Sequence, residues 1–456
     1  MEEALRLLRR HWGFADFRPH QRPIVEAVLG GHDVLAVLPT GGGKSLTFQV
    51  PALVGRGPTL VITPLVALME DQVRRLVHQG VPGACLHGQQ DGAARRLALH
   101  GLTADRWKLF YLSPETLFSP PVWERLTGRP VARIVLDEAH CLVGWGSSFR
   151  PSYHRLGAAR RALGHPPLCA FTATATPRVQ ADLIRLLELR TPVRLAVPPT
   201  RANLHLAVRW TWSPVERRRR IAHTLAARRG STGLVYLRTR SGCETLAAEL
   251  ARQGFSVAPY HAGLAPAERR AREADWLAGK LECLCATNAF GMGIDAPHVR
   301  WVLHAQLPPT LEEYIQEIGR AGRDGAPAEA LMLVSEPTGL IDPTDRTLHT
   351  HFRTQQAAVA ERASRLAAQL PERGQWSPEQ GLDLAVLHAR GQLHWEDPFR
   401  YRLLRHRPPL APERTDGLLA AYLWTRRCRW QFLLAAFGWP DQPACGHCDR
   451  CCRPVG

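Results

Sequence analysis

The sequence lacks the features of a membrane protein and those of a secreted one. No apolar run among its 456 residues approaches the roughly 20 that a membrane-spanning helix needs. Its first residues, MEEALRLLRRHW, begin with acidic side chains and contain no apolar stretch that ends in small residues, so they do not resemble a secretory signal. We therefore expect a cytoplasmic protein with no membrane partner.

Lysine is also scarce, because only three of the 58 basic residues are lysines. Basic residues exceed acidic ones by 17, and the isoelectric point is near 10.1. Lys and Arg side chains that bind phosphates release counterions, which gives a salt-dependent affinity for polyanions. Nucleic acid is the expected partner, and a GC-rich composition that favours Arg over Lys is the alternative explanation.

Cysteines are sparse through most of the chain and crowded at its end. Six of the eleven are scattered from Cys85 to Cys285, where a cytosolic chain mostly uses them as small buried apolar side chains rather than in disulfides. The other five lie in the last thirty residues. This crowding predicts a separate role for the C-terminal cysteines.

Short β-rich runs alternate with helical stretches in two series, a pattern typical of parallel α/β sheets. The first series has its β-rich runs at residues 33–38, 59–64, 108–114, 133–139 and 168–174. After a passage rich in Pro and Arg at 190–205, the second series contains GLVYLRT, FSVAPYH, ECLCATN, VRWVLHA and AEALMLV. Two or three domains are expected at this length. We place two α/β domains at residues 1–199 and 200–336.

Residues 337–456 predict a small, mostly helical domain. The stretches 351–370 and 418–437 are expected to be helices, and 381–404 is expected to be a helix, a turn and a two-stranded ribbon. The segment 375–404 therefore has the outline of a small winged helix. Any helix followed by a hairpin has the same outline, so this alternative stays open.

A glycine-rich loop follows the first predicted strand and precedes the helix-compatible LTFQVPALV; it reads Pro39, Thr40, Gly41, Gly42, Gly43, Lys44, Ser45. Glycines let backbone N–H groups close on phosphate oxygens, and the helix N-terminus adds partial positive charge. Lys44 is expected to reach the β and γ phosphates of ATP, and Ser45 to bind Mg²⁺. Leu38 stands where the strict pattern has its first glycine, so the pattern is met only in part.

Two carboxylates end a later apolar strand. Asp137 and Glu138 are followed by Ala139 and His140, and strand ends of this kind project toward the sheet edge at which ligands bind. Asp137 is expected to hold Mg²⁺, and Glu138 to orient and deprotonate the attacking water.

Phosphoryl transfer also needs cationic side chains on the phosphates. The segment QEIGRAGRDG begins at Gln316 and contains Arg320 and Arg323, whose spacing on a helical turn places both guanidinium groups on one side. An isolated pair with this spacing is more often a solvated helix face. Because Arg320 and Arg323 follow a phosphate-binding loop and an acidic strand end in the chain, we favour a catalytic role for them.

In this order the motifs resemble those of superfamily 2 helicases, and most closely those of the RecQ family of DNA helicases. The resemblance covers residues 17–337 and seven elements: FRPHQ at 17–21, TPL and MEDQV within 63–73, DEAH with Cys141, FTATA at 171–175, YHAGL at 260–264, AT and FGMGI within 286–294, and QEIGRAGRDG at 316–325. It implies two tandem RecA-like domains. It also implies that Arg18 and Gln21 contact the nucleotide, with Gln21 reading the adenine edge, and that FTATA links the ATP state to lobe motion.

The segment 145–153, WGSSFRPSY, resembles the aromatic-rich loop that is a hallmark of the family. Trp145 and Phe149 are expected to stack on unpaired bases, at about 1 to 3 kcal/mol per base, and Arg150 to bind the DNA backbone. Tyr153 ends the same loop. The resemblance implies that DNA binding is relayed to Glu138 and His140. Ordinary aromatic packing is the alternative, and the chain departs from many relatives by having serines at 147 and 148.

Further contacts with the DNA backbone are expected from Thr63, Thr239, Arg240 and Thr287, whose hydroxyl, guanidinium or adjacent N–H groups can bind phosphate without reading sequence. For each threonine, a structural role at a strand end is the alternative.

The C-terminal cysteines have the spacing of a zinc site. Cys428, Cys445, Cys448 and Cys451 form C-x₁₆-C-x₂-C-x₂-C, and thiolates at such spacings close a tetrahedral Zn²⁺ shell. Their surroundings resemble the zinc module of RecQ proteins. Cys452 is a fifth thiol, and a disulfide pair is the alternative.

The chain resembles the shorter members of the family. Either 375–404 replaces the strand-separating wing of the full-length relatives, or single-strand translocation dominates.

Together these features predict an ATP-dependent 3′-to-5′ DNA helicase of DNA repair and recombination, with the direction taken from the resemblance alone. The expected substrates are single-stranded and forked or tailed duplex DNA. We expect a nucleoid-associated monomer, with single-strand-binding protein as a candidate partner. An RNA helicase of DEAH type and an ATP-gated DNA clamp or annealing factor are the alternatives, and the intact Lys44, Asp137 and Glu138 count against the clamp.

Overall fold

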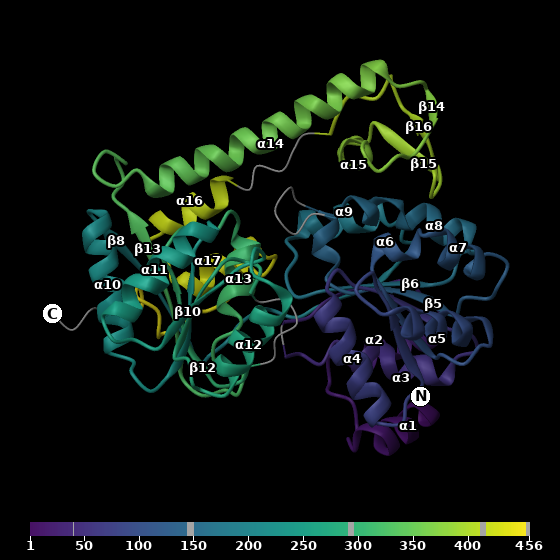
Figure 1. Ribbon diagram of the computed structural model, residues 1–456, viewed down its shortest axis with the longest axis horizontal. Helices are drawn as coiled ribbons and strands as arrows, with labels where there is room; N and C mark the ends of the chain where they lie inside the picture. Colours follow the sequence, from purple (N-terminus) through teal and green to yellow (C-terminus); the bar gives the residue numbers. More distant parts are fainter. Residues whose placement is uncertain (40, 144–149, 291–295, 411–415, 453–456) are drawn as a thin grey trace. The chain divides into compact units, whose positions relative to one another are not determined.

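The structure, a computed structural model, describes residues 1–39, 41–143, 150–290, 296–410 and 416–452 (Figure 1). The chain forms two compact units, of which unit 1 contains residues 1–197 and 356–413 and unit 2 contains residues 198–355 and 414–456. The sequence places 337–456 in a single third domain. In the structure this segment is instead divided between the two units.

Unit 1 is built on a seven-stranded parallel sheet with the order β3-β4-β2-β5-β6-β1-β7. Its strands are β1 (Val34–Val37), β2 (Thr59–Ile62), β3 (Gly83–Leu86), β4 (Leu109–Leu112), β5 (Arg133–Leu136), β6 (Leu168–Thr172) and β7 (Val193–Ala196). All five predicted strands are confirmed. β3 and the largely exposed β7 were not predicted, because β3 is a short run without a motif and β7 lies in the passage rich in Pro and Arg.

Helices cover the sheet of unit 1 on both faces. They are α1 (Glu2–Trp12), α2 (Arg22–Leu29), α3 (Leu46–Val54), α4 (Val66–His78), α5 (Gly92–Thr103), α6 (Pro114–Leu117), α7 (Pro120–Leu126), α8 (Leu156–Ala162) and α9 (Pro177–Leu186), with two 3₁₀ turns, η1 (Ala139–Leu142) and η2 (Pro151–Arg155). Ser and Thr side chains begin several of them; Thr176 accepts from the amide of Val179 at the start of α9.

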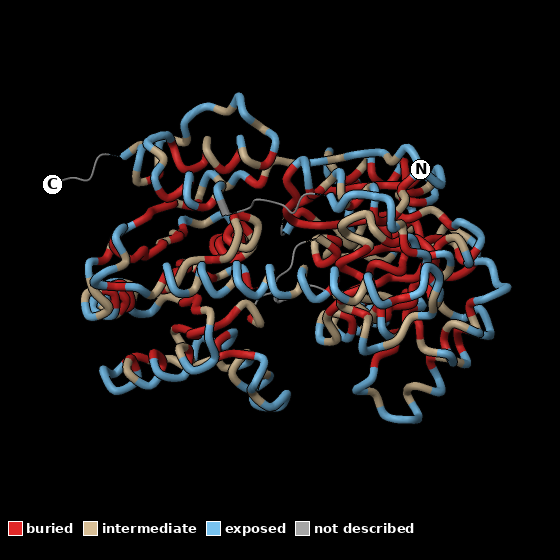
Figure 2. Tube along the Cα trace, turned by 90° about the horizontal axis from the view of Figure 1, so that it is seen from above, coloured by how far each residue is buried: buried red, intermediate tan, exposed pale blue. Residues whose placement is uncertain are grey.

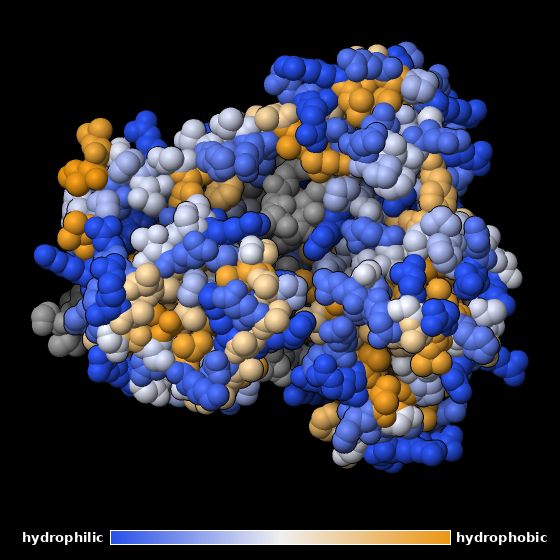
Figure 3. All heavy atoms as spheres, in the orientation of Figure 1, coloured by the Kyte–Doolittle hydropathy of each residue, from blue (hydrophilic) through white to orange (hydrophobic). Residues whose placement is uncertain are grey.

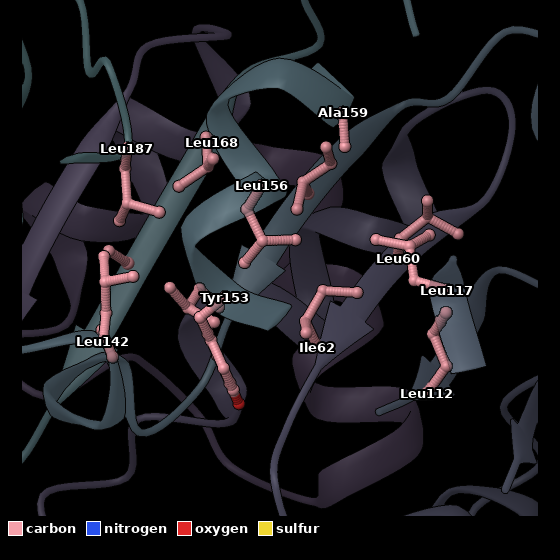
Figure 4. Close-up of a cluster of buried hydrophobic side chains, with 14 of the residues drawn as sticks. Leu60, Ile62, Leu112, Leu117, Leu142, Tyr153, Leu156, Ala159, Leu168 and Leu187 are labelled. Carbon is pink, nitrogen blue, oxygen red and sulfur yellow. The ribbon is translucent and has the colours of Figure 1, made fainter. Parts of the chain in front are cut away.

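The two faces of this sheet carry separate hydrophobic clusters, because alternate strand residues point to opposite sides. Leu60, Ile62 and Leu112 pack on one face, and Val61 and Tyr111 on the other. Figure 4 shows the first cluster, in which residues of η1, η2 and α8 pack against these strands. The buried strands and the exposed outer turns of the helices are visible in Figure 2.

Unit 2 has a six-stranded parallel sheet with the order β10-β11-β9-β12-β13-β8. Its strands are β8 (Leu204–Thr211), β9 (Thr232–Tyr236), β10 (Val257–Tyr260), β11 (Cys283–Ala286), β12 (Val299–His304) and β13 (Ala328–Ser335). Its helices within the α/β part are α10 (Pro214–Ala226), α11 (Arg240–Arg252), α12 (Pro266–Leu277) and α13 (Leu311–Ile318). The five predicted strands are confirmed, and β8 adds an edge strand.

The fold class predicted from the sequence, two RecA-like parallel-sheet domains with a C-terminal cysteine cluster, is therefore confirmed. A single long helix, α14 (Thr344–Gln369), leads out of the second sheet region. It covers the predicted helix at 351–370 and starts earlier, after the buried Asp342.

The predicted helix and ribbon follow α14. They are α15 (Gly381–Ala389) and the hairpin of β15 (Leu393–Asp397) and β16 (Arg400–Leu403), and β14 (Arg373–Gln375) adds a third antiparallel strand beside β16. We call residues 373–403 the ribbon module. Its core is formed by apolar residues of α15 and of the inward face of the hairpin, among them Leu384, Leu387, Trp395 and Tyr401.

The last predicted helix, at 418–437, is in fact two helices, α16 (Asp416–Trp424) and α17 (Arg429–Ala436). The sequence prediction of one helix is wrong because residues 425–428 are not helical; Cys428, with φ −48° and ψ 134°, is the N-cap at which α17 begins. The break therefore ends at the first cysteine of the C-terminal cluster.

Apolar surface is limited on the face that Figure 3 shows, where hydrophilic residues predominate and hydrophobic ones form small groups. Among the described helices, none has the length and hydropathy to cross a membrane.

Candidate functional site

The phosphate-binding loop lies between β1 and α3 in unit 1, as predicted. Gly41 and Gly43 have φ of 80° and 74°, a conformation that favours glycine. The amide of Gly42 donates to the carbonyl of Pro39 at 2.9 Å and closes a tight turn. Thr40 lies outside the described residues. The loop therefore leaves its backbone close to the first turn of α3 without Cβ atoms in the way.

The FRPHQ segment holds this loop from one side. The Gln21 amide donates to the carbonyl of Gly43 at 3.0 Å, and its oxygen accepts from the amide of Arg18 at 2.9 Å. Arg18 Nη1 in turn donates to the carbonyl of Gly41 at 3.1 Å. Gln21 is only 2% exposed. In this arrangement both residues bind the loop backbone, and their predicted contact with adenine stays a prediction.

Lys44 lies against the two carboxylates that follow β5. Its Nζ is 3.3 Å from Glu138 Oε1 and 3.6 Å from Asp137 Oδ1. The amide of Asp137 donates to the carbonyl of Ile62 at 2.9 Å, which ties the end of β5 to β2. Glu138 has φ 53° and ψ 48°, a left-handed conformation that costs a non-glycine residue about 1 to 2 kcal/mol. A strained acidic residue is thus held beside the lysine of the phosphate-binding loop.

Burial and charge together set the ionisation of this group. Burial alone would lower the pKa of Lys44, but the charges of Glu138 and Asp137 raise that pKa above its ordinary value. Against the same effect of burial, Lys44 and His140 hold the pKa of Glu138 well below its usual range. Lys44 and Glu138 are therefore both charged at neutral pH, and the Glu138 carboxylate can accept a hydrogen bond from water.

The oxygen donors near Lys44 fit a magnesium ion. Ser45 is the N-cap of α3 and offers a hydroxyl, and Asp137 directly follows strand β5 and offers a carboxylate. Hydroxyl and carboxylate oxygens are the ligand types that Mg²⁺ prefers, usually together with substrate phosphates. The donor set is thus compatible with the predicted metal.

His140 connects the DEAH segment to β6. Its Nδ1 lies 3.2 Å from Thr172 Oγ1 and 3.3 Å from Glu138 Oε2. The Thr172 hydroxyl also donates to the carbonyl of Thr174 at 3.1 Å. Burial alone would lower the pKa of His140, but its neighbours Cys141 and Glu138 raise it to about 10. A positively charged His140 therefore links the Glu138 carboxylate to the FTATA segment.

The arginine motif of unit 2 follows α13. This helix ends at Ile318, and residues 319–324 form turns in which Gly322 has φ 63°. Arg320 and Arg323 therefore lie beyond the helix, rather than on one of its faces as the sequence predicts. Arg320 is 8% exposed, whereas Arg323 is half-buried and donates from Nε to the carbonyl of Gly319 at 3.4 Å. Gln316 precedes them on α13 and is half-buried.

Two residues that the sequence analysis did not select hold these turns in place. Asn203 Nδ2 donates to the carbonyls of Gly322 at 2.8 Å and Ala326 at 2.7 Å, and Arg201 Nη1 donates to Gly322 at 3.3 Å. A Cβ at Gly322 would stand 2.4 Å from Asn203 Nδ2, so the glycine permits this close approach. Their signal in the sequence was the polar RAN triplet directly before β8.

A second group missed from the sequence fixes the end of α13. Arg238 forms two hydrogen bonds with Glu317, at 2.8 and 2.9 Å, and His304 Nε2 lies 2.7 Å from the same carboxylate. Burial would raise the pKa of Glu317, but Arg238 and His304 lower it to about 2. Tyr236 stacks on His304 with ring centroids 5.5 Å apart. This buried network positions the residues just before Arg320.

The four predicted cysteine ligands come together in unit 2. Their sulfur atoms lie within 4.8 Å of one another; they are Cys428, Cys445, Cys448 and Cys451. Backbone amides donate to these sulfurs, from Cys445 to Cys428 at 3.2 Å and from Arg429 to Cys448 at 3.3 Å. Although burial opposes it, hydrogen bonds from the backbone amides of Cys445 and Gln431 lower the pKa of Cys428 to about 7. Sulfur acceptors at such distances fit a tetrahedral Zn²⁺, and the exposed Cys452 lies outside the group.

Known proteins match the chain over both units. The DEAD/DEAH box helicase model matches residues 18–183, and the helicase conserved C-terminal domain model matches residues 216–325. An ATP-dependent DNA helicase RecQ from Synechocystis is 47% identical over 471 residues, which cover 99% of this chain and 98% of the relative. The chain belongs to the RecQ family. It is an ATP-hydrolysing DNA helicase.

Other matches agree with this assignment. The probable ATP-dependent DNA helicase RecS of Bacillus subtilis is 41% identical over 73% of this chain and 67% of its own length. The solved structure of S. cerevisiae Dbp5 bound to RNA and ADP BeF3 superposes with a TM-score of 0.60, covering 74% of this chain and 88% of that one. Because Dbp5 is only 18% identical to this chain, its likeness shows the fold alone.

The residues predicted to contact DNA in this RecQ helicase lie in different environments. Trp145 and Phe149 lie outside the described residues. Arg150 is half-buried and directly precedes η2. The side chain of Tyr153 is fully buried among Leu142 and its neighbours in the core, as Figure 4 shows. Its predicted contact with DNA stays a prediction.

Two of the three threonines predicted to contact DNA accept hydrogen bonds from nearby backbone amides. Thr239 accepts from the amide of Gly242 at 3.0 Å and caps α11, and Arg240 beside it is exposed. Thr287 accepts from the amide of Ala289 at 3.4 Å. Thr63 follows β2 and is 1% exposed. Their predicted contacts with DNA phosphates remain untested.

Proposed function

We propose that unit 1 binds ATP with magnesium and prepares its γ phosphate for attack by water. Lys44 contacts the β and γ phosphates, Ser45 and Asp137 hold the metal, and Glu138 orients the water. The support is the cluster of Lys44, Asp137 and Glu138 around the glycine loop. Bound Mg²⁺ supplies charge neutralisation on the phosphates. Lys44 then exchanges its carboxylate partners for phosphate oxygens, so binding of ATP frees Glu138 to act on water.

For Arg320 and Arg323 we propose that they stabilise the charge that develops on the transferred phosphoryl group. Guanidinium groups suit this role because their planar forks match phosphate oxygens and they remain charged. The support within unit 2 is the rigid setting of the motif, held by Asn203 and by the Arg238 and Glu317 pair. Gln316 precedes the arginines and is proposed to belong to the same group.

The proposed work of the enzyme is 3′-to-5′ translocation on single-stranded DNA and unwinding of forked or tailed duplexes. We further propose that the enzyme acts as a monomer in the cytoplasm, near the nucleoid, and that single-strand-binding protein is one of its partners. Arg150 and Arg240 are the described cationic residues proposed to bind the DNA backbone. Zinc bound by the four cysteines is proposed to fix α17 to the rest of unit 2.

Unwinding of labelled duplexes with a single-stranded tail of either polarity tests substrate and direction together. We expect ATP-dependent unwinding of the 3′-tailed duplex and none with the 5′-tailed one. The Lys44→Ala variant should lose hydrolysis while retaining DNA binding. Stimulation of hydrolysis by RNA oligomers but not by DNA oligomers would contradict the proposal, as would hydrolysis that persists in Lys44→Ala.

A further inference from the structure

The ribbon module is attached to unit 1 by a buried arginine. Arg155, at the end of η2, is 2% exposed. Its guanidinium carbon lies 4.0 Å from the ring centroid of Phe118 on one side and 4.0 Å from that of Trp376 on the other. Its Nη1 donates to the carbonyl of Pro398 in the β15–β16 turn at 3.2 Å. One side chain from the helicase core therefore contacts two separate parts of the module.

A histidine pair forms a second contact beside it. Nδ1 of His154 lies 3.0 Å from Nδ1 of His388 on α15, and His154 is 1% exposed. A nitrogen contact this short requires one ring to donate and the other to accept, so at least one ring is neutral. Burial, together with the charge of Arg185, lowers the pKa of His154 to about 3, which is consistent with a neutral pair.

The contacts around these two residues extend the interface. Arg161 on α8 binds both Glu188 and the carbonyl of Trp395 in β15. Arg185 on α9 donates to the carbonyl of Ala389 at 3.0 Å. Aromatic rings also contact one another across this interface. The ring centroid of Phe399 in the module lies 5.7 Å from that of Trp123 and 6.3 Å from that of Phe118. The module is thus held by specific polar and aromatic contacts on several elements of unit 1.

The residues that hold the module are connected to the catalytic segment through a short path of backbone hydrogen bonds. The amide of Tyr153 donates to the carbonyl of Arg150 at 3.0 Å, and the amide of Arg150 donates to the carbonyl of Cys141 at 3.3 Å. Cys141 Sγ lies 3.7 Å from Nε2 of His140. Cys141, which precedes the segment that resembles the aromatic-rich loop, is therefore connected to Arg150 and Tyr153 in the C-terminal part of that segment.

We propose that the ribbon module is a brace for the segment 150–155, and that Arg155, His154, Trp376 and His388 are positioning residues for the stimulation of ATP hydrolysis by DNA. The proposal rests on the expectation, implied by the resemblance, that DNA binding at the aromatic-rich loop is relayed to Glu138 and His140. If the brace is removed, the C-terminal end of that loop loses its fixed position relative to Glu138 and His140. Hydrolysis without DNA then continues, but DNA stimulates it less.

This role differs from that of a strand-separating wing. Phe118 and Arg155, which the module covers, are buried at 6% and 2% exposure, and Trp376 is held against them. Moving the module away to meet a duplex would expose a charged side chain and its aromatic partners. The extent of the buried contact favours a module that stays in place and acts through η2.

The test compares full-length Trp376→Ala with Trp376→Phe and with Arg402→Ala. Trp376→Ala removes one of the two rings on Arg155, whereas Trp376→Phe keeps an aromatic face. Arg402 lies on the exposed side of β16, paired with Glu372 at 3.2 Å, and serves as the control within the module. Hydrolysis is measured without DNA and over a range of concentrations of a single-stranded oligomer, and zinc content is measured for each protein.

We expect Trp376→Ala to lower the maximal stimulation by DNA roughly fivefold, as loss of one cation–π contact predicts, with an unchanged rate in the absence of DNA. Trp376→Phe should restore most of the stimulation, and Arg402→Ala should equal the wild type. Equal loss of both rates in Trp376→Ala would overturn the proposal, and so would full stimulation combined with defective unwinding, which indicates a wing. Failure of DNA to stimulate the wild type would instead contradict the proposed DNA sensor itself.

Discussion

The imidazole of His140 contacts the hydroxyl of Thr172, with 3.2 Å between Nδ1 and Oγ1, so the DEAH segment after β5 is hydrogen-bonded to the end of the adjacent strand β6. Oε2 of Glu138 lies 3.3 Å from the same imidazole nitrogen. A substitution at Thr172 can therefore affect the position of Glu138 through the imidazole ring of His140.

Thr172→Val tests this connection, because valine keeps the shape of threonine and removes its hydroxyl. The His140 donor then loses a buried partner, and we expect the free energy of unfolding to fall by about 1 to 3 kcal/mol. DNA-stimulated hydrolysis should fall more than ATP binding does. Nucleotide titration and steady-state kinetics measure the two separately, and an equal change in both would contradict the link.

Gly43→Ala tests the contact between the phosphate-binding loop and Gln21. A Cβ at this position would stand 2.3 Å from Gln21 Nε2, and the φ of 74° is unfavourable for alanine. We expect weaker ATP binding, seen as a raised KM for ATP.

Gly128→Ala is the control for Gly43→Ala. Its φ is 80°, but a Cβ there meets nothing within 4 Å, so it has the backbone strain without the collision. It should lower stability slightly and leave the KM unchanged. Equal KM values in the two variants would indicate that Gln21 does not hold the loop.

Cys445→Ser tests the metal site. We expect the purified variant to lose zinc and to unfold at a lower temperature, because α17 packs on β8 through Trp430, whose Nε1 donates to the carbonyl of Leu204 at 3.1 Å. Cys452→Ser, which changes the exposed fifth thiol, should retain one equivalent of metal. Elemental analysis decides the outcome, and zinc retained by Cys445→Ser would contradict the assignment.

His154 predicts a dependence of stability on pH. Its pKa is about 3 in the folded protein and about 6.5 in the unfolded chain, so the unfolded state binds the proton more readily. Stability is therefore greatest above the unfolded pKa and falls as the pH drops through the window from about 6.5 toward about 3.

The variant His154→Asn keeps a polar side chain that does not titrate. Between about pH 7.5 and about pH 5.5 it should lose about 1.4 kcal/mol less unfolding free energy than the wild type. Denaturant unfolding at both pH values measures the difference. The same loss in both proteins would show that His154 is protonated in the folded state.

The nucleotide site was largely predictable because its residues follow parallel strands, whose carboxyl ends meet at one edge of the sheet. Lys44 and Asp137 could be paired for that reason. The contact between His140 and Thr172 could not be predicted. It depends on β5 and β6 being neighbours in the sheet, and the motifs do not determine the order of the strands.

Other differences have local causes. The burial of Tyr153 could not be predicted, because an aromatic residue at a loop end has the same sequence pattern whether it is exposed or buried. The helix expected at 418–437 is interrupted at residues 425–428, and this stretch, TRRC, contains no glycine or proline that would mark a break in the sequence. The attachment of the ribbon module depends on Arg155 and Trp376, which are far apart in the chain and belong to no motif.

The interleaved order of the two units has a practical consequence for dissecting this helicase. The chain passes from one unit to the other three times, after residues 197, 355 and 413, and the second passage lies inside α14. A fragment that ends at residue 197 would leave Phe118 and Arg155 uncovered, and we expect it to aggregate. A separable ATP-binding fragment would need residues 356–413 supplied with it, as a second chain or through a new linker.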